Sequence, residues 1–138
     1  MKRPFVTLGL VLAGGCGGPS LDPSASESVE RLPPGPQRSA GDAIVAYETA
    51  VRAKDAATLC RRVLFYEGAP SNCERSWRSV LDQQESIAID VQSIEVRGRK
   101  ATTHVKGTRL LPDGKLRVEE DTLQLVRVAA GWRLAIGD

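Results

Sequence analysis

The chain has 138 residues, 26% charged and 41% hydrophobic, which is typical of one modest globular domain. Its formal charge of +2 reflects 19 basic and 17 acidic residues, and two of the basic residues, Lys2 and Arg3, lie in a segment that we expect to be removed. The remaining 17 basic and 17 acidic residues balance, which excludes the basic surface that nucleic-acid binding requires. No nucleic-acid partner is therefore expected.

Residues 1–15 have the order of features found in a secretory signal peptide. Two positive charges precede a short apolar run over residues 5–13, and two glycines lead into Cys16. This arrangement resembles the lipobox of bacterial lipoproteins, although Ala13 stands where Leu, Val or Ile is usual. The resemblance implies that Cys16 carries lipid, including palmitate, and anchors the protein on the extracytoplasmic side of a bacterial envelope membrane. The alternative is an ordinary signal peptide that releases a secreted domain.

Residues 16–38 are predicted to be the lipidated cysteine and a flexible tether. The segment is rich in Pro, Gly and Ser and poor in apolar residues, so it buries too little surface to offset the entropy cost of ordering. Its prolines favour extended conformations. We therefore expect the folded domain to span residues 39–138.

Three helices are predicted between residues 39 and 83. Ser39 begins the first at capping-box spacing, and apolar residues then recur at helical intervals. The apolar stripe of this helix consists of Ala43, Ala46, Tyr47, Ala50 and Val51. Asp55 is expected to cap the second helix, whose inward face carries Cys60. Ser71 is expected to cap the third helix, whose inward face carries Cys73.

The three cysteines are consistent with export. If Cys16 is used for lipid, Cys60 and Cys73 remain as a disulfide pair in an oxidising compartment. A disulfide across so short a loop contributes about 3 kcal/mol in the chain-entropy model. The competing interpretation is a catalytic thiolate paired with His104. With one histidine and no free cysteine, a Cys/His zinc site cannot be assembled, so neither a metal nor a cofactor is expected.

After Gln84 the apolar period becomes alternating, which predicts four strands joined by short turns. The alternation that starts at Ile87 changes parity at Ile94, which predicts a β-bulge near residues 92–93. A second change of parity predicts that residues 119–121 interrupt the third strand. The sequence therefore predicts an α+β domain with three helices packed on a curved four-stranded antiparallel sheet.

Three short stretches carry a resemblance to a known fold: D-A-I-V-A-Y from residue 42, K-D-A-A-T-L-C from residue 54, and G-W-R-L from residue 131. With their order, they resemble the nuclear transport factor 2-like (NTF2-like) domain, the cone-shaped fold shared by SnoaL-like and ketosteroid-isomerase-like proteins. The resemblance covers about residues 39–138 and implies a pocket between helices and sheet. Tyr47 and Trp77 are its candidate lining residues, although core packing is the commoner role for such aromatics.

Enzymes of this family rely on a buried carboxylate base and a donor to an oxyanion. The resemblance makes Asp90 and Glu95 the candidate bases and Tyr47 the candidate donor. Asp90 has the parity opposite to its apolar neighbours and is expected to face solvent, as is His104. The acids at residues 119–121 are expected to form a solvated bend and not a cation site. No catalytic residue is therefore assigned.

The favoured function is a non-catalytic, membrane-tethered envelope lipoprotein whose domain binds a partner protein or a small apolar molecule. The alternative is a SnoaL-like or ketosteroid-isomerase-like enzyme that acts on a small apolar substrate. A third hypothesis is homodimerisation through the outer face of the sheet, because Val126 and Val128 have the parity opposite to Leu123 and Leu125.

Overall fold

The computed structural model describes residues 24–83 and 86–135. The predicted signal peptide, Cys16 and the first part of the predicted tether lie outside these residues. The helical elements are α1 (Ala25–Glu30), α2 (Pro36–Arg52), α3 (Ala56–Thr58), a π-helical turn (Leu59–Val63) and α4 (Pro70–Asp82). The strands are β2 (Leu64–Phe65), β3 (Ser86–Arg97), β4 (Lys100–Leu110), β5 (Leu116–Val128) and β6 (Gly131–Ala135).

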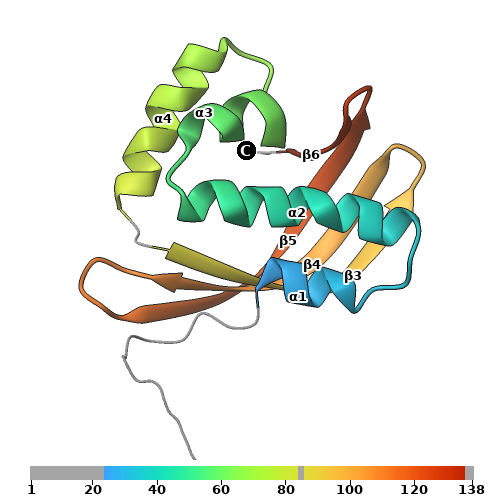
Figure 1. Ribbon diagram of the computed structural model, residues 1–138. Helices are drawn as coiled ribbons and strands as arrows, with labels where there is room; N and C mark the ends of the chain where they lie inside the picture. The colour runs from blue at the N-terminus through green and yellow to red at the C-terminus, as the bar shows by residue number, and fades with distance from the viewer. Residues whose placement is uncertain (1–23, 84–85, 136–138) are drawn as a thin grey trace, which may run out of the picture.

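The strands form one five-stranded sheet in the order β2-β6-β5-β4-β3. Strands β3 to β6 are antiparallel to their neighbours, and β2 pairs in parallel with β6. The predicted α+β class is confirmed. The prediction of a four-stranded antiparallel sheet is wrong in one respect, because the sheet has a fifth, short strand, β2, that is parallel to its neighbour. Figure 1 shows α2 crossing one face of the sheet, with α1 beside β3 and with α3 and α4 together above α2 in this view.

Helix α2 begins at Pro36, three residues before the predicted start at Ser39. Proline is favoured in the first turn of a helix because its missing N–H has no partner there anyway. The buried face of α2 also differs from the predicted stripe: Ala46 is exposed, and Ile44 is fully buried.

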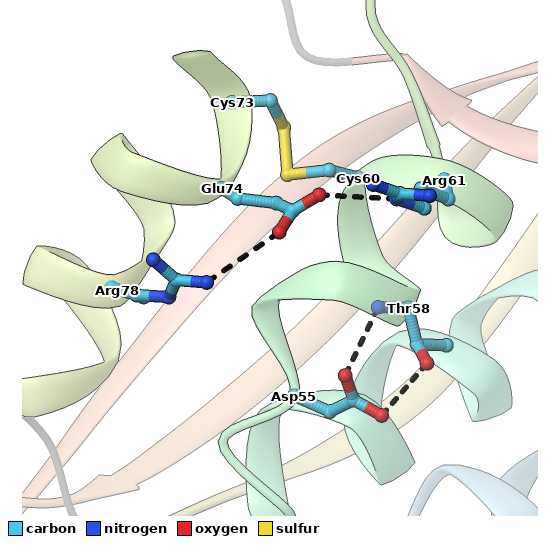
Figure 2. The surroundings of a disulfide bond; sticks show 7 residues. All are labelled: Asp55, Thr58, Cys60, Arg61, Cys73, Glu74 and Arg78. Atoms are coloured by element: carbon cyan, nitrogen blue, oxygen red, sulfur yellow. Dashed lines mark hydrogen bonds and ion pairs between the residues drawn. A yellow bond between two sulfur atoms is a disulfide. The ribbon is translucent and has the colours of Figure 1, made fainter. Parts of the chain in front are cut away.

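The other two predicted caps have different outcomes. Asp55 caps α3 as predicted, because its carboxylate accepts hydrogen bonds from the backbone N–H of Thr58 at 3.0 Å and from its hydroxyl at 2.7 Å (Figure 2). Both hydrogen bonds lower the pKa of the Asp55 carboxyl, and the bond from the backbone N–H has the larger effect. Ser71 is not a cap, since α4 begins at Pro70.

The folded domain begins before residue 39, so the predicted tether is wrong over residues 24–38. Helix α1 starts with a capping box between Ser24 and Glu27. Its residues Ala25 and Val29 are 0% and 2% exposed, because α1 packs against α2 and β3. These tertiary contacts stabilise a segment whose composition alone predicts disorder.

A buried carboxylate joins α1 to the sheet. Glu48 of α2 is 4% exposed, and its Oε2 accepts hydrogen bonds from the backbone N–H of Ala25 at 2.9 Å and of Ile89 at 2.8 Å. The guanidinium of Arg52 lies 3.8 Å from the other carboxylate oxygen. Glu48 therefore links α1, α2 and β3 through one side chain.

Other side chains continue this pairing along the free edge of β3. The Oγ of buried Ser28 accepts a hydrogen bond from the backbone N–H of Val91 at 2.9 Å. Arg52 donates through Nε to the carbonyl of Ile87 at 2.7 Å. Since β3 is an edge strand, these side chains pair backbone groups that have no neighbouring strand.

The predicted disulfide is confirmed: Cys60 in the π-helical turn is bonded to Cys73 in α4 (Figure 2). A charged group reinforces the same junction. Glu74, 9% exposed, lies 3.1 Å from Nε of Arg61 and 3.6 Å from the guanidinium of Arg78. Covalent and ionic contacts therefore fix α4 against the preceding turn.

The predicted bulge in β3 is confirmed by a register shift between Val91 and Ser93. The predicted interruption at residues 119–121 is wrong, because β5 pairs with β4 without a break from Leu116 to Val126. Its apolar residues change parity because they lie on opposite faces of one continuous strand. Leu116 and Val118, 42% and 55% exposed, lie on the outer face.

Candidate functional site

Two cavities lie between the helices and the sheet, and they share Tyr47, Asp121 and Leu123 in their walls. The first, of about 80 Å³, lies over the middle of β3, β4 and β5. The residues completing its wall are Ile87, Ile89, Val105, Gly107, Thr108, Arg109 and Glu119. The second, of about 380 Å³, extends to Trp77 of α4 and Leu134 of β6. Their shared wall makes them one candidate site.

Tyr47 and Trp77, the two candidate pocket residues from the sequence, meet at this site. Their ring centroids are 6.1 Å apart and the rings are inclined at 83°, which is a favourable edge-to-face contact. Burial raises the pKa of the Tyr47 phenol, and the positive charge of Arg109 opposes this shift in part. The hydroxyl is therefore protonated at neutral pH and is available as a hydrogen-bond donor and acceptor.

Charged side chains of β4 and β5 form the polar part of the wall. The carboxylate of Glu119 lies 3.6 Å from Nε of Arg109 and 3.5 Å from Nε of Arg117. Asp121, two residues along the same face of β5, accepts a hydrogen bond from the backbone N–H of Thr122 at 2.8 Å. Glu119 therefore makes two ion pairs in this wall. Asp121 makes no ion pair with any residue that the structure describes.

Gly107 leaves the floor of the first cavity open. It lies between Ile89 and Glu119 in the registers of the sheet. A Cβ at this position would meet nothing nearer than the Glu119 carbonyl oxygen, at 3.9 Å. A Cβ at residue 107 is therefore accommodated without displacing the backbone, and a longer side chain would project from it toward the cavity.

The candidate catalytic carboxylates do not belong to this site. Asp90 forms an ion pair with Arg31 at 3.2 Å, and Glu95 forms one with Arg97 at 3.1 Å. Both carboxylates lie on the face of the sheet opposite the cavities. The exposure predicted for His104 is confirmed, because this residue lies on the outer side of β4.

The sequence does not predict several of the lining residues. The bend predicted at residues 119–121 is wrong, because β5 is continuous there, whereas the predicted exposure of the three acids is confirmed. Glu119 and Asp121 line the first cavity, whereas Glu120 lies on the outer side of β5. Reading the strand as continuous gives this result, because residues 119 and 121 have the parity of Leu123 and Leu125. No comparable local signal identifies Gly107.

The described part of the chain has neither a cluster of metal-binding side chains nor a helix that could span a membrane. Within residues 24–83 and 86–135, no group of three or more His, Cys, Asp or Glu side chains is arranged to hold a metal ion. No helix in those ranges combines the length and the apolar character needed to span a bilayer.

Comparison with solved structures identifies the fold. No protein-family model matches the chain, and no curated protein matches it. A candidate dehydratase of the NTF2-like family from Streptomyces avermitilis superposes with a TM-score of 0.55 at 20% identity, covering 70% of this chain and 89% of that one. A SEC-C motif containing protein from Rhodopseudomonas palustris gives 0.59 at 12%, covering 72% and 77%. A candidate aromatic ring hydroxylase from Novosphingobium aromaticivorans gives 0.52 at 16%, covering 70% and 81%.

The domain therefore has an NTF2-like fold, as the sequence resemblance implies. At these identities the likeness establishes the fold alone, since proteins of one fold perform many different functions.

Proposed function

We propose that this protein is a lipid-anchored binding protein of the bacterial cell envelope, whose domain takes a small, largely apolar molecule into the paired cavities. The observation that carries the proposal is the second cavity of about 380 Å³, which opens beside Trp77, Leu123 and Leu134. Pockets for small molecules typically measure about 300–1,000 Å³ and combine apolar walls with a few polar groups. The Tyr47 hydroxyl and the neighbouring charges are the polar groups here.

Filling the first cavity is expected to weaken binding without unfolding the domain. The change is Gly107→Leu, whose side chain enters the space that the glycine leaves open. We expect the affinity for a neutral apolar probe, phenethyl alcohol, to fall roughly tenfold, the equivalent of about 1.4 kcal/mol of lost apolar contact. Ligand-observed NMR titration of the purified mature protein measures the change.

The matched control is Thr102→Val, a change in the same strand on the outer face of the sheet. It is expected to leave the affinity unchanged. Equal affinities of the Gly107→Leu variant and the unmodified protein, or no binding of the probe at all, would contradict the proposed binding site.

A second candidate is a SnoaL-like or ketosteroid-isomerase-like enzyme. It is favoured by one observation: the hydroxyl-bearing Tyr47 and the carboxylate-bearing Asp121 line the same cavities. Binding remains preferred because Asp121 is exposed, whereas catalytic carboxylates of this kind are shielded from water. Mass spectrometry of small molecules that co-purify separates the two: a binding protein returns them unchanged after incubation, and an enzyme converts them.

The anchor is tested at Cys16. We expect cells grown with labelled palmitate to incorporate the label into the unmodified protein and not into a Cys16→Ala variant, because the thiol is the proposed site of lipid attachment. The variant is also expected to move from the membrane fraction to the soluble fraction. Equal labelling of the two proteins would contradict lipid attachment at this residue.

Homodimerisation through the outer face of the sheet stays a prediction. The exposure of Leu116 and Val118 on that face supports it. A partner protein of the envelope is the other open possibility for that surface.

A further inference from the structure

We infer that the molecule bound in the paired cavities is an organic cation, in which a protonated amine is attached to a small aromatic or branched aliphatic body. This inference rests on the proposed function, because it names the chemical class of the ligand for the same site. It is carried by the position of one carboxylate relative to the other charges and to two aromatic rings.

The first step concerns the charges in the wall. Glu119 is flanked by Arg109 and Arg117, with N–O distances of 3.6 and 3.5 Å, so its negative charge is offset. Asp121 lies in the wall shared by both cavities, and among the described residues no ion pair offsets its charge. An ammonium group bound beside Asp121 would form an ion pair with this exposed carboxylate.

The second step concerns the surroundings of Asp121. Its cross-strand partner, Val105, is 5% exposed, and its neighbour on the same face of β5 is Leu123. Tyr47 and Trp77 complete the larger cavity. Aromatic rings attract cations through their negative faces, and the neutral Tyr47 oxygen can accept a hydrogen bond from an ammonium group. A cavity lined by a carboxylate and two aromatic rings is therefore suited to an amine with an apolar body.

The third step excludes the opposite charge. An anionic ligand would bind to Arg109, the positively charged residue of the wall. Glu119 already pairs with this residue, at 3.6 Å from its Nε. An anion in the shared part of the cavities would also face Asp121. The arrangement therefore favours a cation over a neutral molecule, and a neutral molecule over an anion.

The test compares three probes of similar shape on the purified mature protein with its disulfide intact: phenethylamine, phenethyl alcohol and phenylacetate. At neutral pH we expect the amine to bind roughly tenfold more tightly than the alcohol, and phenylacetate to bind most weakly. Replacing Asp121 by Asn is expected to remove the preference for the amine over the alcohol.

The matched control is Glu120→Gln, which removes the same charge from the adjacent residue on the outer side of β5. It is expected to preserve the preference for the amine. If the alcohol binds and the amine binds no more tightly, or if Asp121→Asn keeps the preference, the inference is wrong and the proposed binding function still stands. If no probe binds, the proposed function fails, and the inference fails with it.

Discussion

Reduction of the Cys60–Cys73 disulfide is expected to lower the free energy of unfolding by about 3 kcal/mol. The bond joins residues separated by 13 positions, and its loss allows the unfolded chain to sample many more conformations. For a domain of this size, whose total stability is about 5–15 kcal/mol, that is a large share. Urea unfolding followed by tryptophan fluorescence, with and without reductant, measures the difference.

Reduction is a cleaner test than substitution, because Cys60 and Cys73 are 6% and 1% exposed and alanine at either position would also leave a cavity. A Cys60→Ala, Cys73→Ala double variant is therefore expected to be less stable than the reduced protein. Identical unfolding curves with and without reductant would contradict a stabilising role for the disulfide.

Replacing Glu48 by Ala is expected to lower the free energy of unfolding by about 3 kcal/mol. The change leaves the backbone N–H groups of Ala25 and Ile89 without their buried acceptor and removes one of the links between α1 and the sheet. Hydrogen bonds to a charged group contribute about 1.5–3 kcal/mol each, and an unpaired buried donor is costly. Chemical unfolding measures the loss, and faster amide exchange at Ile89 locates it.

Two further variants separate the causes. Glu48→Gln keeps one oxygen as acceptor but loses the negative charge beside Arg52, so we expect it to be destabilised less than Glu48→Ala. Glu95→Ala removes an exposed carboxylate from β3 and is expected to change the free energy of unfolding by no more than about 0.5 kcal/mol. Equal stabilities of the Glu48→Ala and Glu95→Ala variants would contradict the role of Glu48 as the link.

The sequence predicts well those elements in which buried apolar residues recur at the regular interval of a strand or helix. The apolar alternation from Ile87 to Val91 and its shift at Ile94 reflect which side chains reach the core, so the strand and its bulge are both predictable. The disulfide is predictable for another reason: export and helical spacing leave one plausible pair of cysteines. Helix starts are harder to predict, because Pro36 and Pro70 begin helices without a side-chain cap.

The missed elements depend on contacts between distant parts of the chain. Helix α1 has only two buried apolar residues, and its order depends on Glu48 and β3. Strand β2 has two residues and exists by pairing with β6. Glu48 itself had a signal: it occurs at helical spacing between Ile44 and Val51, so a carboxylate lies on the buried face of α2.

The sequence predicts the aromatic residues of the candidate site and does not predict its charged residues. Tyr47 and Trp77 follow the apolar faces of their helices, which a helical period reveals. The apolar residues change parity between Val118 and Leu123, which predicts a bend at residues 119–121 and a solvated Asp121. In this fold Glu119 and Asp121 face a cavity, and a cavity keeps some side chains of an inward face in contact with water.

The position of α1 determines where a usable fragment of this protein can begin. A fragment that starts at Ser39, where the helical pattern begins, would lack the hydroxyl of Ser28, which accepts a hydrogen bond from the N–H of Val91 at the edge of β3. It would also lack the N–H of Ala25, which donates to the Glu48 carboxylate. Its edge strand β3 would then have unpaired backbone groups, through which chains can pair edge to edge and aggregate. Poor solubility of such a fragment would therefore reflect the missing turn of helix and not an intrinsic property of the domain.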